Sequence, residues 1–208
     1  MVRELSIGVL GIQGAISEHI ASMEAVLKET NNPGKVFVVD HKEKITEIDA
    51  LIIPGGESTT ISKVLHKSDL YNIIYKRIKE KNLPIMGTCA GCVILSKELY
   101  NDNVKDVTLL NAIDMQVERN AFGRQKESFE KYIDIQGFSS PYNAVFIRAP
   151  IIKKIWHTCK ALAKIDKKIV MARQDNNLAV SFHPELTNDL RIHKYFLDMV
   201  LDFYYRHS

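Results

Sequence analysis

Cys89 stands in a segment, Gly87-Thr88-Cys89-Ala90-Gly91, whose composition suits a nucleophile. An apolar stretch precedes the segment and a helical pattern follows it, which is the setting of a sharp strand-to-helix turn that exposes a reactive side chain. The flanking glycines lack the bulk that such a crowded turn excludes, and a helix amino terminus favours the reactive thiolate. The N–H of Ala90 is then expected to form half of an oxyanion hole. Alternatively, Cys89 is a small buried side chain at a tight turn, and the segment alone does not decide between the two.

His183 and Glu185 are the residues that would complete a cysteine hydrolase. Pro184 fixes its own φ and disfavours helix at the residue before it, so His183-Pro184-Glu185 is predicted to be a rigid extended tripeptide. Side chains two positions apart in an extended segment share a side, which lets the Glu185 carboxylate reach the His183 ring. The carboxylate would fix the imidazole tautomer, and the imidazole would take the thiol proton and return it to the leaving amine. The alternative is that both residues simply cap the last helix.

Two further loops are expected beside Cys89, because ligands of an open α/β sheet bind beyond the carboxyl ends of its strands. One loop contains Gln13 and Gly14, and the other spans residues 54–58. The paired glycines Gly55 and Gly56 allow the backbone to approach a ligand closely or to turn a peptide N–H into an oxyanion hole. An ordinary turn would use the same residues.

Two other motifs favour different functions. Three glycines between positions 8 and 14, with Asp40 further on, resemble a dinucleotide-binding motif, but their spacing is G-x-x-G-x-x-G instead of G-x-G-x-x-G. Cys89 and Cys92 form a C-x-x-C at a helix start, as in redox proteins, and this remains a minor alternative.

The elements that must position these residues alternate between short apolar runs and helical periodicities, which is typical of β-α-β units and of a parallel sheet covered on both faces. Strands are predicted in the first half at residues 5–12, 36–39, 49–53 and 84–88. Helices are predicted at residues 16–27, 70–78, 90–99 and 192–203.

The second half, from residue 113 to residue 182, changes to short β-like segments joined by turn residues. These segments are predicted at residues 115–118, 132–136, 144–147, 169–173 and 178–182, and the last two form a hairpin around residues 174–177. No repeat or linker interrupts the sequence, so residues 1–208 are expected to form a single domain. The fold class is therefore α/β, with a mostly parallel central sheet and an added antiparallel hairpin region.

The composition is that of an ordinary globular protein, with 46% hydrophobic and 25% charged residues. The formal net charge is +3 and the basic residues form only short clusters, so no nucleic-acid partner is expected. The sequence shows no signal-peptide pattern and no apolar run of about 20 residues. We therefore expect no membrane partner and a cytoplasmic location, which the small number of cysteines also fits.

These segments resemble the triad-type, or class I, glutamine amidotransferases, which place a cysteine turn and a later His-Pro-Glu on a flavodoxin-like sheet. Within that class the sequence is similar to the glutaminase subunits of pyridoxal 5'-phosphate (PLP) synthase over almost the whole chain. The segments that match are residues 10–15 (LGIQGA) with 18–19 (EH), 54–60 (PGGESTT), 87–91 (GTCAG), 118–120 (ERN) with 122–125 (FGRQ) and 128–130 (SFE), 146–150 (FIRAP), and 181–187 (SFHPELT). The segment around Arg119 is much more specific than the cysteine turn.

This resemblance implies a three-layer, flavodoxin-like sandwich and the hydrolysis of L-glutamine to L-glutamate and ammonia. It implies a catalytic triad of Cys89, His183 and Glu185, with oxyanion-hole donors at Gly56 and Ala90. An arginine suits the α-carboxylate of glutamine, and a glutamate suits its ammonium group. No cofactor and no metal are expected. The residues that would hold glutamine are Gly55, Gly56, Glu57, Arg119, Ile147 and Arg148.

The resemblance also implies a partner, the barrel-shaped synthase subunit that takes up the ammonia and builds PLP, the coenzyme form of vitamin B6. Free ammonia is lost to protonation in water, so hydrolysis is useful when the product passes directly into a dry tunnel. Gln13, Gly14, Glu18 and His19 are the candidates for contact with that partner, or for transmitting its arrival to the Gly55-Gly56 peptide.

Two features depart from the family pattern. Cys92 replaces a residue that is usually apolar, which raises the hypothesis of an inhibitory disulfide with Cys89 under oxidation. The chain is also longer over residues 101–114 and 155–168, whose geometry is left open. The alternatives to PLP synthesis are a glutaminase of another pathway, such as histidine or purine synthesis, and a non-catalytic regulatory subunit. The segment from 119 to 130 argues against the first, and the complete set of three triad residues argues against the second.

Overall fold

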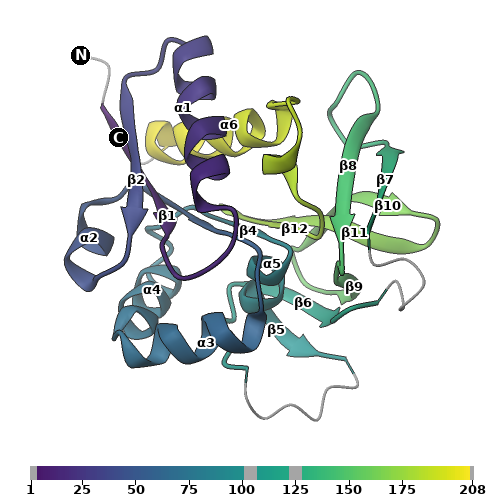
Figure 1. The fold of residues 1–208 in the computed structure, drawn as a ribbon, viewed down its shortest axis with the longest axis horizontal. Helices are drawn as coiled ribbons and strands as arrows, with labels where there is room; N and C mark the ends of the chain where they lie inside the picture. The colour runs from purple at the N-terminus through teal and green to yellow at the C-terminus, as the bar shows by residue number, and fades with distance from the viewer. Residues whose placement is uncertain (1–3, 101–106, 122–127, 207–208) are drawn as a thin grey trace.

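A mixed β-sheet with helices on both faces forms the centre of the protein (Figure 1). The computed structural model describes residues 4–100, 107–121 and 128–206, and the sheet has ten strands within them. Five neighbouring strands, in the order β2-β1-β3-β4-β12, are parallel to one another. Their bounds are β1 Leu5–Leu10, β2 Gly34–Val39, β3 Ala50–Ile53, β4 Ile85–Thr88 and β12 Asn177–Val180.

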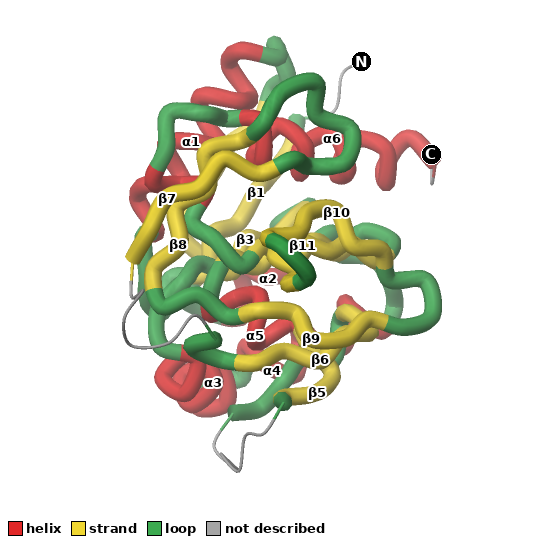
Figure 2. The backbone as a smooth tube through the Cα atoms, turned by 90° about the vertical axis from the view of Figure 1, so that its right-hand side faces the viewer, coloured by secondary structure: helices red, strands yellow, loops and turns green. Residues whose placement is uncertain are grey.

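The remaining strands extend the sheet beyond β12, mostly with antiparallel pairing. β11 and β12 form the hairpin that the sequence predicts, with Gln174 opposite Asn177. A separate antiparallel ribbon of β7 and β8 stands beside the main sheet, as Figure 2 shows. The bounds of these strands are β5 Ser96–Leu99, β6 Ile113–Glu118, β7 Ser128–Ile133, β8 Tyr142–Ile147, β9 Ile151–Ile155, β10 Lys160–Ile165 and β11 Lys168–Gln174.

Helices cover the two faces of the sheet and create two apolar clusters. α1 (Ile16–Glu29) and α6 (Arg191–Arg206) pack on one face, while α2 (Lys42–Glu47), α3 (Ser58–Lys67), α4 (Leu70–Lys79) and α5 (Ala90–Leu95) pack on the other. α1 buries one stripe of residues at helical spacing, with Met23, Val26 and Leu27 among them, whereas all six residues of α5 are buried. The expected α/β fold with a mostly parallel sheet, covered on both faces, is confirmed.

The prediction of one helix over residues 90–99 is wrong. α5 ends at Leu95, and Ser96 begins β5, which pairs in parallel with β6. The Ser96 hydroxyl donates to the carbonyl oxygen of Val93 at 2.8 Å, which competes with continuation of the helix. The partner strand is distant in sequence, so local periodicity could not reveal it.

Other elements differ from the prediction in their bounds. β7 begins at Ser128 and ends at Ile133, earlier than the predicted strand at 132–136. The long segment 155–168 contains β10, which pairs with β11. Residues 122–125, which carry part of the family resemblance, lie outside the described residues. Within the described ranges no helix has the length and apolar character needed to cross a membrane.

Candidate active site

The loops after β1, β3, β4 and β12 meet at the carboxyl ends of the parallel strands. Thr88 of β4 pairs with Val180 of β12, so the segments that carry Cys89 and His183 leave the sheet at the same edge. Gly55 lies between them: a methyl group at this position would come within 2.6 Å of His183 Cε1 and 3.3 Å of Cys89 Cβ. Gly14 packs against the carbonyl group of Gly55. The convergence of these loops, expected from the sheet topology, is present.

Cys89 lies on a strained turn between β4 and α5. Its φ of 47° and ψ of −105° are rare for a residue with a side chain. The surroundings hold this conformation, because the Cys89 N–H donates to the Val180 carbonyl at 2.8 Å. The flanking glycines are needed for space, since a methyl group on Gly87 would lie 2.5 Å from the Gly91 carbonyl oxygen. The Cys89 side chain is 7% exposed, and its thiol faces the Ile147 carbonyl oxygen at 3.8 Å.

His183 lies beside both Cys89 and Glu185. Its Nδ1 lies 2.7 Å from Oε1 of Glu185, and a methyl group on Gly55 would touch both its ring and Cβ of Cys89, so the ring adjoins the nucleophile. The prediction of an extended tripeptide is wrong, because Pro184–Leu186 form a single 3₁₀ turn. Proline is well accommodated at the first position of such a turn, where its missing N–H is not needed. The contact between the histidine and the carboxylate is present all the same.

The charge of His183 depends on its two partners. Burial opposes the charged ring, but the hydrogen bonds and charges of Cys89 and Glu185 outweigh burial and raise the pKa of His183 to about 10. Both partners therefore favour the protonated form of the ring. Cys92 is fully buried, and burial raises the pKa of its thiol far above the usual value. Little thiolate is then available at Cys92, so the structure lends no support to exchange within the C-x-x-C.

The loop after β3 is held by the loop after β1. Gly56 has a φ of 132°, a conformation that side chains rarely tolerate. The N–H of the next residue, Glu57, donates to the side-chain oxygen of Gln13 at 2.8 Å. Gly56 and Ala90, the expected oxyanion-hole donors, both line a small cavity at Cys89. The side chain of Gln13 therefore helps to fix the backbone that faces the nucleophile.

The residues expected to hold glutamine surround the same cavity. Gly56, Glu57, Arg119 and Arg148 line it, whereas Gly55 and Ile147 contact Cys89 directly. Arg119 Nη2 lies 3.1 Å from Oε1 of Glu57, so these two side chains form an ion pair across the site. The cavity measures about 30 Å³. The ion pair and the glycine loop therefore border it directly beside Cys89.

The candidates for partner contact divide into two groups. Gln13, Gly14 and Glu18 are exposed on the loop before α1 and on its first turn. His19 is completely buried, so the expectation of a direct partner contact is corrected for this residue. Its ring lies inside the protein near Glu185, because the helix turns successive side chains to different faces.

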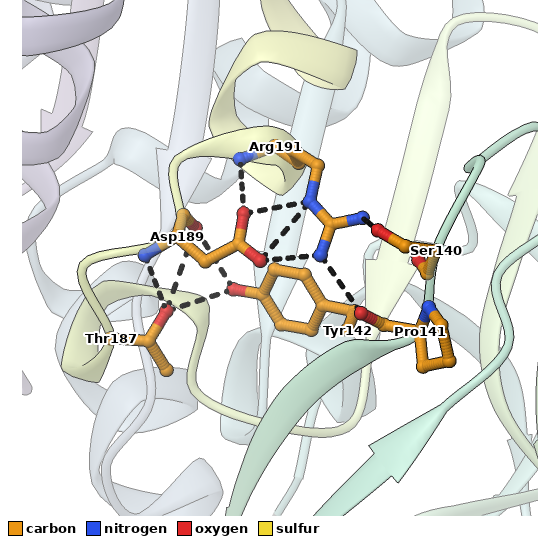
Figure 3. Close-up of polar contacts among 6 residues, drawn as sticks. All are labelled: Ser140, Pro141, Tyr142, Thr187, Asp189 and Arg191. Atoms are coloured by element: carbon orange, nitrogen blue, oxygen red, sulfur yellow. Dashed lines mark hydrogen bonds and ion pairs between the residues drawn. The ribbon is translucent and has the colours of Figure 1, made fainter.

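Sequence reasoning missed a polar network that holds the segment after His183 (Figure 3). Arg191 pairs with the Asp189 carboxylate at 2.6 Å and donates to the carbonyl oxygens of Ser140 at 2.8 Å and Pro141 at 3.0 Å. The Tyr142 hydroxyl donates to the Asp189 carbonyl at 3.2 Å. The network thus joins the start of β8 to the loop that follows Pro184–Leu186. The one feature of the sequence that could have indicated this network is the spacing of Asp189 and Arg191 just before an apolar helix.

A larger groove lies at the opposite edge of the sheet, near the amino ends of β4 and β12. Its volume is about 860 Å³, and Cys159, Lys160, Arg173 and Asn176 contribute to its lining. None of the residues expected to do chemistry line this groove. We place the active site at the smaller cavity, because the nucleophile, the base and the conformationally strained turn meet there. The described residues contain no group of three or more His, Cys, Asp or Glu that could hold a metal ion.

Comparison with known proteins identifies the family. Residues 9–202 match the SNO glutamine amidotransferase family. The chain belongs to this family. Cys89, His183, Glu185 and the loops around them all lie within the matched residues.

Relatives in the SNO glutamine amidotransferase family match the chain over its length. It is 46% identical over 201 residues to pyridoxal 5'-phosphate synthase subunit PdxT of Methanococcoides burtonii, with 95% of the chain and 100% of the relative covered. PdxT of Brevibacillus brevis is 46% identical over 200 residues, with 96% and 99% covered. A crystal structure of a glutamine amidotransferase superposes with a TM-score of 0.82 at 40% identity, covering 93% of the chain and 98% of that structure. A glutamine amidotransferase of Thermotoga maritima, 12% identical with a TM-score of 0.61 and 97% and 98% covered, shares the fold alone.

Proposed function

We propose that the chain is a glutaminase that hydrolyses L-glutamine to L-glutamate and ammonia and supplies the ammonia for the synthesis of PLP. The observation that carries this proposal is the alignment of Cys89, His183 and Glu185, with Gly55 against the first two. A cysteine on a strained turn, a base in contact with it and a carboxylate that orients the base are the parts of a nucleophilic amide hydrolase. Membership of a glutamine amidotransferase family supports glutamine as the amide.

The proposed reaction uses His183 first as an acid and then as a base. The Cys89 thiolate adds to the amide carbon, and the resulting oxyanion accepts hydrogen bonds from the backbone at Ala90 and Gly56. His183 gives its proton to the amide nitrogen as the C–N bond breaks, which releases ammonia and leaves a thioester. Water then attacks the thioester while His183 takes a proton from it. The C–S bond breaks, giving glutamate and restoring the thiolate beside the protonated ring.

Glutamine recognition is proposed to use the ion pair that lines the cavity. Arg119 has the charge and shape to bind the α-carboxylate of glutamine, and Glu57 has the charge to bind its ammonium group. In the ligand-free chain these two groups bind one another at 3.1 Å. Substrate would replace each partner by a group of the same charge, so both charges stay paired in both states. Gly55, Ile147 and Arg148 complete the proposed pocket.

The proposed partner is the synthase subunit of PLP synthase, which would receive the ammonia. Relatives that are 46% identical are named as subunits of that enzyme. The exposed Gln13, Gly14 and Glu18 lie on the loop and helix that adjoin the Gly56 backbone, so contact there would reach the oxyanion loop through the Gln13–Glu57 hydrogen bond. Glutamine-dependent PLP formation by the mixed subunits would support this partner. A mixture that forms PLP from ammonium salts but not from glutamine would contradict it.

The proposed function is tested by changing the nucleophile. Cys89→Ala should reduce glutamate release by about a thousandfold or more, because the remaining groups only polarise the amide. Cys159→Ala is the matched control, since Cys159 is equally buried but lines the groove at the other edge of the sheet. That control should retain full activity. Glutamate release that survives Cys89→Ala would exclude the proposed function.

A further inference from the structure

A buried polar cluster adjoins the second carboxylate oxygen of Glu185. It consists of His19 from α1, His193 from α6, and Thr88, the last residue of β4. The side chains of His19 and Glu185 have no exposed area, and Thr88 and His193 are also 0% exposed. Polar groups at this depth need partners, because unpaired groups in the interior cost free energy. The hydrogens of this cluster are therefore expected to lie between paired atoms.

Nε2 of His19 faces two oxygen atoms. It lies 3.1 Å from the Thr88 hydroxyl oxygen and 3.3 Å from Oε2 of Glu185. An ionised carboxylate has no hydrogen to donate, so a lone pair on Nε2 would be repelled by Oε2. A hydrogen on Nε2 removes that repulsion and gives the threonine oxygen a donor. His19 is therefore expected to be the Nε2–H tautomer.

His193 can maintain that tautomer. Its Nε2 lies 3.0 Å from Nδ1 of His19, so a hydrogen on His193 Nε2 is donated to the His19 lone pair. The other nitrogen of His193, Nδ1, is buried and has no hydrogen-bond partner among the described residues. With the hydrogen on Nε2, Nδ1 of His193 is an unpaired acceptor instead of an unpaired donor. Both hydrogens of the pair then point toward the active site.

The two histidine rings of the cluster are neutral at neutral pH. Burial lowers the pKa of His19, assisted by the nearby His193 and His183 rings. Burial also lowers the pKa of His193, to about 4. The groups that face His19 are Glu185 and His183 from the loop after β12 and His193 from α6. His19 therefore offers Glu185 a hydrogen without adding a second positive charge beside it.

We propose that His19 and His193 are positioning residues for the reaction, in which His193 fixes the tautomer of His19 and His19 holds Glu185 and Thr88. This inference rests on the proposed function. Oε1 of Glu185 binds His183, whereas Oε2 is buried without a hydrogen-bond partner among the described residues and has the His19 ring nitrogen as its polar neighbour at 3.3 Å, so an electrostatic contact with an Nε2–H of His19 would restrain the second oxygen. Thr88 immediately precedes Cys89, so the same nitrogen also restrains the start of the nucleophile turn. One buried ring thereby keeps the base and the nucleophile at a fixed separation.

The first test measures the tautomer directly and does not depend on activity. Two-bond ¹H–¹⁵N correlation spectra of the histidine rings in the full chain should show His19 as the Nε2–H form at pH 7.5. The same ring should become a mixture of tautomers in His193→Leu, because the donor to Nδ1 is lost. An Nδ1–H form, or a charged ring, in the unchanged chain would overturn the proposal.

The second test separates positioning from packing by pairs of variants. Removing an outer hydrogen-bond partner of a catalytic group lowers activity by about 10- to 100-fold, so His193→Leu and His19→Leu should lower kcat within this range. KM should change by less than about twofold, since neither residue lines the cavity. The amide nitrogen of glutamine lies near the position of Nε2, so His193→Gln and His19→Gln should recover most of the lost kcat. Gln variants as slow as the Leu variants would overturn the positioning role.

Different results would contradict the proposed glutaminase function and the positioning role of the histidines. If Cys89→Ala still releases glutamate, the proposed function is wrong whatever the histidine variants do. If activity requires Cys89 but both Leu variants keep full kcat, only the positioning role is wrong. Should a Leu variant fail to fold, the tautomer of His19 in the unchanged chain still decides the assignment.

Discussion

Gly55 has no side chain, and the arrangement of Cys89 and His183 depends on that absence. A methyl group at Gly55 would stand 2.6 Å from the His183 ring, so Gly55→Ala must push the ring away from Cys89 or shift the loop. Misplacing a reacting group by about 1 Å lowers the rate by about a hundredfold. We expect Gly55→Ala to remain folded and to lose about a hundredfold in kcat/KM for glutamine hydrolysis.

Gly137→Ala is the control for this substitution. Gly137 has a φ of 92° and open space where a methyl group would stand, and it lies far from Cys89 in the sequence and outside the cavity lining. Strain at this residue should lower the free energy of unfolding by about 1 kcal/mol and leave kcat/KM unchanged. Equal losses of activity in both variants would mean that backbone strain, and not the contact with His183, explains the effect.

At the scale of elements, the network around Arg191 holds two segments that both reach the active site. β8 ends at Ile147, whose carbonyl faces the Cys89 thiol, and the loop before Arg191 follows the turn that carries Glu185. Lysine cannot reproduce the paired donors of arginine. Arg191→Lys should therefore lower the free energy of unfolding by about 1 to 3 kcal/mol, measured by urea unfolding. We also expect a severalfold decrease in kcat, because both segments loosen together.

Arg173→Lys provides the comparison for Arg191. Arg173 also donates to a backbone oxygen, of Asp175, and to the Tyr195 hydroxyl, but it lies on the groove at the amino ends of the strands. Its replacement should leave kcat unchanged. If Arg173→Lys lowered kcat as much as Arg191→Lys, a general loss of stability would explain both results.

The sequence predicted elements well where periodicity is local, and poorly where pairing is distant. The strand before Cys89 and the hairpin of β11 and β12 followed from short apolar runs and turn residues. The division of residues 90–99 into α5 and β5 did not, because β5 forms by pairing with β6, which begins only at Ile113. The helix α3 after the glycine loop was also missed.

In the active site, too, the sequence predicted contacts between near neighbours and missed contacts between distant residues. The contact of His183 with Glu185 was predicted from a spacing of two residues, although the backbone there is a 3₁₀ turn and not a strand. The contact of His19 with His193 joins residues 174 positions apart, and no motif links them. Only the packing of α1 against α6 brings them together. The ion pair of Arg119 with Glu57 likewise joins residues 62 positions apart.

At the scale of the whole molecule, the buried histidines make stability depend on pH. The pKa of His193 is lowered to about 4 by burial, whereas a histidine in the unfolded chain has a pKa of about 6.5. Between these values the unfolded chain binds a proton that the folded chain excludes. The contribution of His193 to the free energy of unfolding is therefore fully present above about pH 6.5. It is lost as the pH falls toward about 4. His193 alone should contribute a loss on the order of 3 kcal/mol.

The measurement is the free energy of unfolding of the chain and of His193→Gln between pH 7 and pH 4. Carboxylates also titrate in this range, and the variant retains them, so the difference between the two curves isolates the histidine. The variant's curve should be flatter. Parallel curves would contradict a neutral, buried His193.

The ion pair beside Cys89 has a kinetic and regulatory consequence for the proposed glutamine pocket. If Arg119 and Glu57 hold glutamine as proposed, they must first release one another, so the affinity measured on the isolated chain would be weakened in proportion to how seldom the separated form occurs. A protein that binds the separated form would tighten glutamine binding without touching glutamine. The ion pair would then keep glutamine from being consumed while no acceptor for its nitrogen is at hand.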